Sequence, residues 1–439
     1  MHDILTNRCP PLLHYRYGAH LSKEEVAELV APNPNTLELV HSWLAHHEVQ
    51  PSSISTTHGG NWLTLTGMPV LQANKLLGAS YQLYRYAGTN DTAILRTTDY
   101  SLPTVLHAHV QTVVPTTLFA SPRMLQQTPQ MHPVGEVGVP EKVALREVLS
   151  SRGHGRIEPD DLRWLYKTEA YVPKAIAKNK LGVAGYKNEF PSFTDLERFM
   201  IALRSDAVDA TFEVKEINGS EFDPDMPGYE ANLNMQYAQA MAYPTPHIFY
   251  SIGGKNLASD TDRRPMANDC DVVWLSYLLE LEDGDIPQTI SISYGSNETI
   301  FPREYAVPIC DLYAKLGARG VSILSASGDY GVGGPGDCKD ENDRVQFIPT
   351  FPASCMSDVI SSPTSCTHSQ AQVTDHIFAG PYITSVGGTT GILPEVGVDI
   401  SGGGFSNIFP QPDFQKVSVP AFLTSLGTKN KGLYKFVFC

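Results

Sequence analysis

The spacing of apolar and polar positions divides the chain into two differently patterned parts. In residues 1–120, alternating stretches at Trp62–Thr66 and Tyr81–Tyr86 predict strands, and segments of helical periodicity begin with a capping box at Ser22 and with a proline at Pro69. Strands and helices interleaved in so short a span predict a small α+β unit of the ferredoxin-like type.

In residues 159–439, short apolar runs alternate with helical segments. Helices are expected over Asp271–Glu282 and Glu304–Gly317, with Pro308 either kinking the second helix or lying in its first turn. Apolar strands separated by helices predict an α/β fold with a parallel sheet covered on both faces, in which ligands bind beyond the carboxyl ends of the strands. The strands are expected at Leu181–Tyr186, Ala210–Glu216, His247–Ile252, Thr289–Tyr294, Val321–Ser325 and Tyr382–Val386.

Between these parts, residues 121–158 lose their periodicity and contain several glycines together with Pro122, Pro129, Pro133 and Pro140. Such a segment is typical of a linker and is a natural place for proteolytic processing. The sequence therefore predicts a small domain over 1–120, a linker over 121–158 and a larger α/β domain over 159–439.

Composition argues against some classes of partner. The 439 residues carry a net charge of −15, which argues against nucleic acid, because phosphate binding needs a basic face. No run of about 18 apolar residues is present, so we expect no membrane-spanning segment. The first residues lack the apolar core of a signal peptide, but three sequons, at Asn90, Asn218 and Asn297, favour the secretory route and are glycosylation candidates.

Seven cysteines occur without a C-x-x-C pair, so a structural zinc site is not expected. Cys338 and Cys355 flank a polar loop and either bridge in an oxidising compartment or remain two free thiols. His107, His109 and His247 have no metal-ligand spacing, and we reject a metal or catalytic-triad role for them.

Three of the expected strands run into unusual loops. One is followed by Ser293-Tyr294-Gly295, the next by a glycine-rich stretch over 325–334 that carries Asp329, and the last by Gly387–Thr390 and then Ser401–Asn407. Glycines at strand ends let the backbone approach a ligand closely, and Ser-Gly-Asp places a carboxyl group at such an end. Any one of these loops has a plain turn as its alternative, but their recurrence in one sheet favours a binding site.

The segment Tyr229–Tyr237, with the sequence YEANLNMQY, is expected to be a helix that places Glu230 and Asn234 one turn apart on the same face. Taken alone, such a pair is typical of a solvated surface. A catalytic role for the pair therefore needs support from the rest of the sequence.

Six motifs, found in sequence order, carry a specific resemblance to a known family. They are RYGAHLSKEEV (16–26), EANLNMQY (230–237), SASGDYGVGG (325–334), FPASC (351–355), PYITSVGGTT (381–390) and SGGGFSNIFPQPDFQ (401–415). Over residues 16–434 the chain resembles the sedolisins, which are serine-carboxyl peptidases, and among them the fungal, tripeptidyl-peptidase-like type.

The resemblance implies a subtilisin-like fold, preceded by a pro-domain that acts as an intramolecular inhibitor. In the family a serine attacks the peptide carbonyl, a glutamate is the general base, an aspartate one turn further orients it, and a second aspartate serves the oxyanion hole. By motif, Glu230 matches the base, Asn234 stands at the position of the orienting aspartate, and Asp329 matches the oxyanion residue. Ser293-Tyr294-Gly295 would offer backbone groups to an extended peptide as an added strand.

The implied activity is that of a secreted acid peptidase that releases tripeptides from peptide N-termini, although exo- versus endopeptidase action stays open. A carboxylate base with an ordinary pKa of about 4.3 suits acid pH. So does a carboxyl group that donates to an oxyanion only when protonated. The family also binds calcium, and the resemblance places those ligands beyond Cys439.

Four departures from the family pattern alter these expectations. Asn234 replaces an aspartate, and the Ser-Gly-Thr-Ser motif expected after Gly432-Leu433-Tyr434 is missing. Residues 356–380 intervene as a surface insertion or a retained intron, and the first ~15 residues do not match the family's early pro-domain. The chain as given is therefore expected to be a truncated, inactive peptidase or a pseudoenzyme that binds peptides or inhibits. An unrelated α/β binding protein that uses the glycine-rich loops is a third interpretation.

Overall fold

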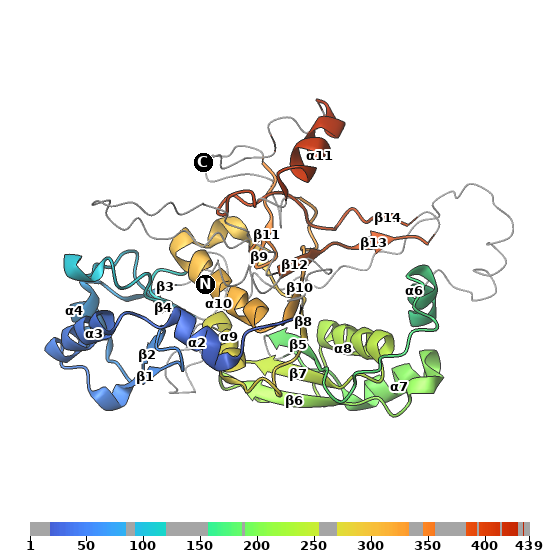
Figure 1. Cartoon of the computed structure of the whole chain (residues 1–439), viewed down its shortest axis with the longest axis horizontal. Coiled ribbons are helices and arrows are strands. Elements are labelled where there is room, and N and C mark those ends of the chain that lie inside the picture. Colours follow the sequence, from blue (N-terminus) through green and yellow to red (C-terminus); the bar gives the residue numbers. More distant parts are fainter. Residues whose placement is uncertain are drawn as a thin grey trace, which may run out of the picture.

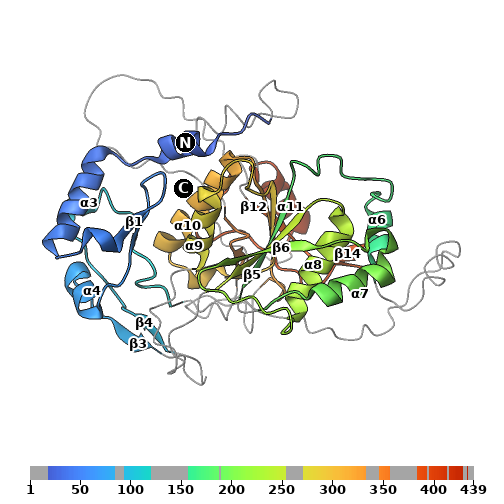
Figure 2. The same cartoon turned by 90° about the horizontal axis from the view of Figure 1, so that it is seen from below.

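The computed structural model describes residues 18–84, 93–119, 157–186, 189–253, 270–332, 346–355, 383–392, 395–412, 415–428 and 433. Figure 1 shows a small N-terminal part of helices and short strands beside a larger part built around one central sheet. Helices of the larger part lie between this sheet and the N-terminal part (Figure 2).

The central sheet has six parallel strands in the order β12-β10-β8-β5-β7-β6. This sheet confirms the predicted α/β fold, and β5 and β7 have the bounds expected from the sequence. The strands span Leu181–Tyr186 (β5), Phe212–Ile217 (β6), His247–Ile252 (β7), Thr289–Ile292 (β8), Ser322–Ala326 (β10) and Ile383–Val386 (β12).

Helices cover both faces of this sheet (Figures 1 and 2). On one face lie α7 (Phe193–Leu203) and α8 (Tyr229–Ala242), and on the other lie α9 (Cys270–Glu280) and α10 (Arg303–Ala318). Pro308 lies inside α10, so the interpretation that it marks the first turn is wrong. It costs the helix one backbone hydrogen bond, because proline has no N–H.

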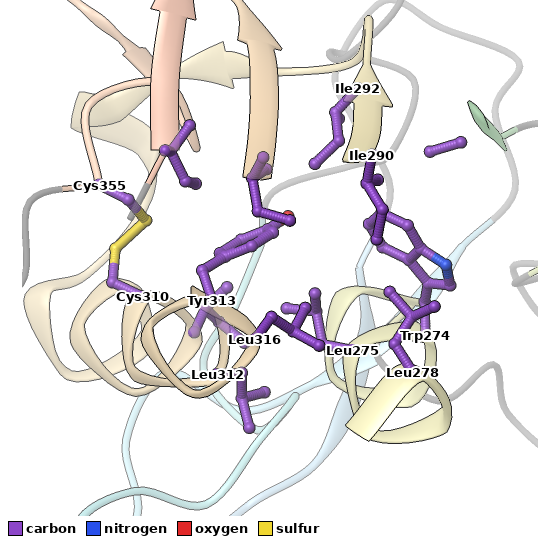
Figure 3. Close-up of a cluster of buried hydrophobic side chains, with 14 of the residues drawn as sticks. Trp274, Leu275, Leu278, Ile290, Ile292, Cys310, Leu312, Tyr313, Leu316 and Cys355 are labelled. Carbon is purple, nitrogen blue, oxygen red and sulfur yellow. A yellow bond between two sulfur atoms is a disulfide. The ribbon is translucent and has the colours of Figure 1, made fainter. Parts of the chain in front are cut away.

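A large cluster of buried apolar side chains fills the space between the sheet and the α9–α10 face (Figure 3). Trp274 and Leu275 of α9 are 0% exposed, Tyr313 of α10 is 1% exposed, and strand residues such as Ile290 belong to the same cluster. Full burial of each side chain of this size contributes about 1.5–3 kcal/mol relative to leaving it exposed. This layer fixes where the strands end and therefore where the loops after them begin.

On the opposite face, Met200 of α7 and Met235 of α8 are buried in one cluster with Val183 and Phe249. Every residue of β7 is buried, including the polar His247 and Ser251, and its sequence therefore shows no alternation of apolar and polar positions. Packing on this face holds α8, the helix that carries Glu230 and Asn234, against the sheet.

The N-terminal part contains α2 (Lys23–Val30), α3 (Pro34–His46), α4 (Val70–Leu77) and four short strands. The expected capping box is confirmed, because Glu25 N–H donates to Ser22 Oγ at 3.1 Å and Ser22 N–H donates to Glu25 Oε2 at 2.9 Å. Within the described residues the strands form two separate antiparallel pairs and not one ferredoxin-like sheet. Each of the described strands is three residues long and pairs only with its neighbour in sequence. The pairs are Ile54–Thr56 (β1) with Leu63–Leu65 (β2), and Gln82–Tyr84 (β3) with Ile94–Arg96 (β4).

The N-terminal part docks on α10, and Figure 1 shows α2 beside α9 and α10. Leu21 and Val26 pack in one buried cluster with Ala314 and Ala318 of α10. Leu21 N–H also donates to the Ala318 carbonyl at 2.9 Å. The two parts therefore share an apolar contact near the C-terminal end of this helix.

The structure corrects the cysteine prediction. Cys355 forms a disulfide with Cys310 of α10, with the two Cα atoms 5.4 Å apart, so pairing with Cys338 is wrong (Figure 3). Cys355 follows β11 (Thr350–Phe351), which pairs with β9 (Ser296–Asn297). This pairing carries Cys355 to the buried side of α10, where both cysteines are 1% exposed.

Shorter elements are α6 (Pro159–Leu165), α11 (Ser418–Leu426) and the pair β13 (Thr389–Thr390) and β14 (Val396–Gly397). Across the described ranges, none of the helices has both the length and the apolar character needed to cross a membrane. The expected insertion at 356–380 lies outside the described residues, as does the expected linker except for its last two positions, 157 and 158.

Candidate active site

The loops expected to bind a ligand leave the sheet side by side at its carboxyl edge. β8 and β10 are parallel neighbours, with Ile292 opposite Ser325. Ser293-Tyr294-Gly295 follows β8 and the turn at Gly328-Asp329 follows β10, so both loops start at this edge. Parallel α/β sheets bind their ligands at the same edge.

Helix α8 begins near this edge, and its first turns are tied to the loop that follows β5. Its N-cap residue Gly228 donates through its N–H to the Phe190 carbonyl at 3.0 Å. The Asn232 side chain accepts the Ser192 N–H at 2.8 Å and donates to the Asp195 carboxylate at 2.9 Å. These bonds fix where α8 starts relative to the strand ends.

Glu230, the expected base, lies in the first turn of α8 and is only 9% exposed. The alternative of a solvated surface pair is therefore wrong for this residue. The free N–H groups of a helix N-terminus favour a negative charge at this position. At the strand ends, burial raises the pKa of the Tyr294 hydroxyl, and the charges of Glu230 and Glu189 raise it further.

Asn234 joins α8 to the loop after β8. The Ser293 hydroxyl donates to Asn234 Oδ1 at 3.0 Å. Asn234 lies one turn after Glu230, so the two side chains leave the same side of the helix. The structure therefore brings four of the expected site residues together: Glu230, Asn234, Ser293 and Tyr294.

Asp329 reaches the same edge on the neighbouring loop. The residue is exposed, yet withdrawal of part of its carboxyl group from water raises its pKa. Its turn is held from two sides by the segment after β14: Gly402 N–H donates to the Gly328 carbonyl, and Gly331 N–H donates to the Ile400 carbonyl, both at 2.8 Å. The raised pKa keeps the carboxyl group a neutral hydrogen-bond donor over a wider acid range.

Two glycines in these loops are required by the protein's own packing. A Cβ atom at Gly295 would stand 2.6 Å from the Thr350 side chain and 2.8 Å from the Phe351 carbonyl oxygen. A Cβ atom at Gly402 would overlap the carbonyl oxygen of Ser327. These glycines let the loops pack against one another, and the close approach of a ligand to them stays a prediction.

Sequence reasoning missed two acidic residues at this edge, Glu189 and Glu298. Glu189 lies against the start of α8, where a Cβ atom on Gly228 would be 2.6 Å from its Oε2, and its charge reaches Tyr294. Glu298 is 0% exposed and binds the segment after β14. A signal existed, because each lies a few positions past an expected strand, at the edge where the site was expected.

Within the described ranges there is no group of three or more His, Cys, Asp or Glu residues that could hold a metal ion, and the calcium ligands expected beyond Cys439 stay a prediction. The three histidines each have a different neighbour. His109 Nδ1 is 2.8 Å from Thr36 Oγ1, and His107 Nε2 is 2.9 Å from the Leu102 carbonyl oxygen. His247 is buried in β7, and burial lowers its pKa, which favours the neutral ring.

The three glycosylation candidates stay predictions. Asn90 lies outside the described residues. Asn218 is half-buried and donates through Nδ2 to the Gly253 carbonyl at 3.1 Å. Asn297 is half-buried in β9.

The parallel sheet, the acidic site at its carboxyl edge and the docked N-terminal part define the class as an α/β protein with an attached pro-domain. Residues 12–119 match the family described as the pro-kumamolisin activation domain. With its relatives taken into account, the chain belongs to the sedolisin family.

Two curated relatives illustrate this membership. The chain is 32% identical over 429 residues to the probable tripeptidyl-peptidase SED2 of Trichophyton verrucosum, and 31% identical over 427 residues to the tripeptidyl-peptidase SED2 of Arthroderma otae. Each comparison covers 95% of this chain, which spans 66% of the length of either relative. A solved structure of Pseudomonas sedolisin, complexed with two molecules of pseudo-iodotyrostatin, is 17% identical with a TM-score of 0.39, over 61% of this chain and 67% of that one.

Proposed function

We propose that this protein functions as an acid peptidase of the serine-carboxyl type, which releases tripeptides from peptide N-termini outside the cell, with its nucleophile in a Ser-Gly-Thr-Ser motif encoded after Tyr434. Residues 1–439 lack that motif, so this chain alone is expected to be inactive. In this proposal Glu230 is the general base and Asp329 serves the oxyanion hole. The observation that carries it is the Ser293–Asn234 hydrogen bond of 3.0 Å, which holds the helix bearing Glu230 against a loop at the carboxyl edge of the sheet. The names of the relatives supply the substrate class.

Acid pH follows from the chemistry of the two carboxyl groups. A glutamate with an ordinary pKa of about 4.3 accepts protons most effectively near that pH. The Asp329 carboxyl donates to an oxyanion only when protonated, and the rise of its pKa extends the protonated form to higher pH. Activity is therefore expected in the pH window where Glu230 is ionised and Asp329 is neutral.

Asn234 stands where the family has a carboxyl group that orients the base. Its Oδ1 accepts the Ser293 hydroxyl, which leaves its two N–H groups as donors. Such donors stabilise an ionised carboxylate one helical turn away, but an amide cannot share a proton with it. The orientation of Glu230 is therefore retained in this proposal, while the proton exchange of a carboxyl pair is lost.

The loop after β8 offers backbone groups to an extended substrate. The Tyr294 ring points into the protein, where it is 3% exposed and its centroid lies 5.1 Å from that of the Tyr186 ring. This buried ring fixes the backbone on either side of it, at Ser293 and Gly295. A peptide that pairs with this backbone as an added strand would lie along the carboxyl edge of the sheet.

The pro-domain is an intramolecular inhibitor in this proposal, and a polar latch of Lys23, Glu280, Glu282, Asp283 and Arg319 holds it. Lys23 Nζ donates to the Glu280 carbonyl at 2.5 Å and to Glu282 Oε1 at 2.9 Å. Its backbone N–H donates to Asp283 at 3.2 Å, and Arg319 donates to the same carboxylate oxygen at 2.7 Å. A cation at the C-terminal end of α9 is also favoured by the helix dipole. Release of the pro-domain requires the bonds of Lys23 to break, while the Arg319–Asp283 pair lies within the larger domain.

A second candidate function is peptide binding without turnover. The observation in its favour is Asn234, a single change inside an otherwise well-preserved motif. Catalytic groups that act as a unit lose several orders of magnitude in rate when one of them is altered. A protein with such a site would bind peptides, or inhibit through its pro-domain.

Product analysis separates the two functions. The protein encoded by the full-length transcript is purified and incubated at about pH 4 with an unblocked peptide and with its N-acetylated counterpart, and the products are identified by mass spectrometry. Tripeptides that appear from the unblocked peptide alone, and not with Glu230→Gln, support the peptidase. Binding without cleavage, read by fluorescence anisotropy, supports the binding protein, and the failure of both assays overturns both functions.

The transcript provides an independent test. We expect the message to encode a Ser-Gly-Thr-Ser motif shortly after the codon for Tyr434. A message whose reading frame stops after Cys439 supports the binding protein instead.

A further inference from the structure

Glu298 is a buried acidic residue that the proposed mechanism does not use. It follows β9 directly and is 0% exposed. Its own N–H donates to the Pro349 carbonyl at 2.9 Å. Because burying a carboxylate is costly unless hydrogen bonds compensate, its partners show what the burial achieves.

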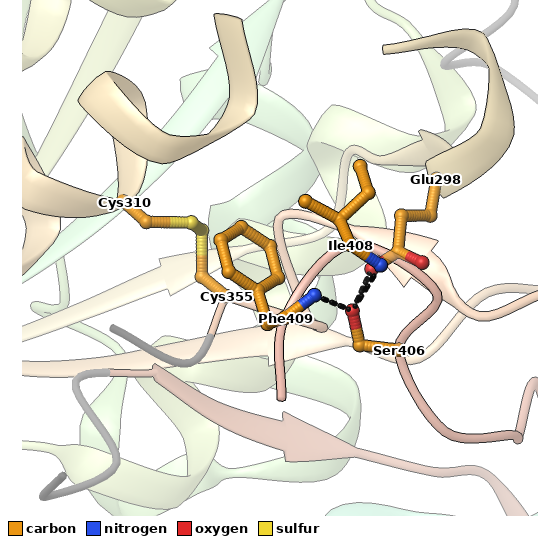
Figure 4. The surroundings of a disulfide bond; sticks show 6 residues. All are labelled: Glu298, Cys310, Cys355, Ser406, Ile408 and Phe409. Carbon is orange, nitrogen blue, oxygen red and sulfur yellow. Dashed lines mark hydrogen bonds between the residues drawn. A yellow bond between two sulfur atoms is a disulfide. The ribbon is translucent and has the colours of Figure 1, made fainter. Parts of the chain in front are cut away.

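The Glu298 carboxylate gathers donors from a segment 109 positions further along the chain (Figure 4). Asn407 N–H donates to Oε2 at 2.6 Å, and the Ser406 hydroxyl donates to Oε1. Ser406 Oγ in turn accepts the N–H groups of Ile408 at 3.1 Å and Phe409 at 2.8 Å. One carboxylate therefore organises three consecutive backbone N–H groups, directly or through a single hydroxyl.

A charged side chain reaches the same segment from α10. Arg303 donates through Nη1 to the Ile408 carbonyl, on the backbone that Glu298 holds. Burial raises the pKa of Glu298, while the hydrogen bonds from Ser406 and Asn407 act in the opposite direction by favouring the ionised form. Both carboxyl oxygens of Glu298 accept hydrogen bonds, from Ser406 and from the Asn407 N–H, which is the arrangement that suits a carboxylate.

The apolar side of this anchor is Phe409. Its side chain is 5% exposed and belongs to the buried cluster that contains Cys310 and Cys355. Figure 4 shows the Phe409 ring between the disulfide and Ser406. Glu298 and this apolar contact together fix the C-terminal end of the segment 401–409.

The N-terminal end of the same segment holds the turn that carries Asp329. Gly402 N–H donates to the Gly328 carbonyl at 2.8 Å. The approach is so close that a Cβ atom at Gly402 would overlap the Ser327 carbonyl oxygen. A displacement of the segment is therefore passed on to the Asp329 turn, because the two backbones touch.

We propose that Glu298 is a positioning residue: it anchors the segment 401–409, and the segment sets the burial and direction of the Asp329 carboxyl group. The significance of this coupling for an oxyanion rests on the proposed function, but the coupling itself does not. A glutamine at 298 would have the same shape and only one side-chain oxygen. If its oxygen accepts the Asn407 N–H, its NH₂ group faces Ser406 Oγ, whose two lone pairs already accept the N–H groups of Ile408 and Phe409. In the other orientation its NH₂ group faces the Asn407 N–H, so in either case one hydrogen bond is lost.

The test is Glu298→Gln in the full chain, read at Asp329. The titration of the Asp329 carboxyl carbon is followed by NMR, and the amides of residues 407–409 by hydrogen exchange. We expect the pKa of Asp329 to fall towards its ordinary value, because its turn loses part of its cover. The amides of residues 407–409 should exchange about tenfold faster, as the loss of one buried hydrogen bond predicts.

Leu196→Ala is the matched control, since Leu196 is 1% exposed in the cluster on the opposite face of the sheet. This variant lowers overall stability, and the titration of Asp329 should stay as in the parent protein. An unchanged pKa of Asp329 in Glu298→Gln, or an equal shift in Leu196→Ala, overturns the proposal. If Glu298→Gln does not fold, Ser406→Ala is used instead, because it removes one donor to Glu298. It should lower the pKa of Asp329 by less than Glu298→Gln would. An unchanged pKa of Asp329 in Ser406→Ala also overturns the proposal.

A failure of the proposed function gives a different result. If Asp329→Asn leaves peptide cleavage and binding unchanged, Asp329 is not the oxyanion residue. The coupling from Glu298 is still measured in that case, because the Asp329 carboxyl titrates in the parent protein without any substrate.

Discussion

The Ser293 hydroxyl donates to the Asn234 side-chain oxygen at 3.0 Å, across 59 positions of sequence. The bond joins a helix on one face of the sheet to a loop at the sheet's carboxyl edge. A charge introduced at residue 234 would therefore act on two neighbours, the Ser293 hydroxyl and Glu230 one turn away.

Asn234→Asp should place two carboxyl groups one helical turn apart. Their repulsion, when both are ionised, is expected to lower the free energy of unfolding by about 0.5 kcal/mol. Urea unfolding should show this loss near neutral pH, and the loss should shrink at about pH 4, where one of the two groups is protonated. The same stability difference from the parent at both pH values would mean that the two side chains do not face each other.

Ser293→Ala removes the donor to Asn234 and should lower the free energy of unfolding by about 1 kcal/mol, the usual net value of one hydrogen bond. Ser322→Ala, at an exposed position of β10, is the matched control and should stay within about 0.5 kcal/mol of the parent. Equal losses in the two variants, measured by urea unfolding, would argue against the Ser293–Asn234 bond.

Lys315 is buried in α10, and burial lowers its pKa from 10.5 to about 8, against the attraction of Asp311. The folded state then binds fewer protons than the unfolded state between these two values, so stability rises as pH rises from about 8 towards 10.5. Lys315→Met should abolish this rise and increase the free energy of unfolding near neutral pH by about 3 kcal/mol. Urea unfolding near neutral pH and at about pH 9.5 checks both effects; a variant no more stable than the parent near neutral pH would contradict the burial of this charge.

Lys23→Ala should loosen the pro-domain by removing the cation of the polar latch. Partly exposed ion pairs contribute about 0.2–1 kcal/mol, so limited proteolysis of the pro-domain should become about 1.4- to fivefold faster. Lys75→Ala, at an exposed lysine of α4, provides the control for loss of a positive charge. Identical proteolysis rates for the two variants would count against the latch.

Peptide mapping without reduction should recover Cys310 linked to Cys355. The bond closes a loop with a sequence separation of 45, for which chain entropy predicts a contribution of about 4 kcal/mol. The double replacement Cys310→Ala and Cys355→Ala should lose about this amount in urea unfolding. Recovery of Cys355 linked to Cys338 would restore the pairing considered from sequence.

Local patterns were enough to predict much of the sheet and the expected site residues. β5 and β7 were expected at their observed bounds because each is a short, mainly apolar segment without charged residues. Glu230 and Asn234 were recognised from helical spacing and motif, both of which are local properties. Their burial was not predictable in the same way, because it depends on how α8 packs on the sheet.

Long-range partners explain what the sequence could not predict. The partner of Cys355 depends on the pairing of β9 with β11, which are two residues each and leave no periodic signal. Glu298 stands in a polar stretch, and its burial depends on Ser406 and Asn407, more than a hundred positions away. The pro-domain was expected to be ferredoxin-like with strands at Trp62–Thr66 and Tyr81–Tyr86, but among its described residues the strands pair only with their neighbours in sequence, as two separate antiparallel pairs.

Leu21 and Val26 rest on α10 over Ala314 and Ala318. Both α10 residues at this contact are alanines, so the apolar area there is small. A second contact is larger, because Leu118 of the N-terminal part is buried in the cluster that contains Phe301 and Tyr305, with Trp62 and Val114 packed against it. Departure of the N-terminal part would leave these aromatic rings facing water, so the larger domain would gain a sticky apolar surface unless another surface covered it.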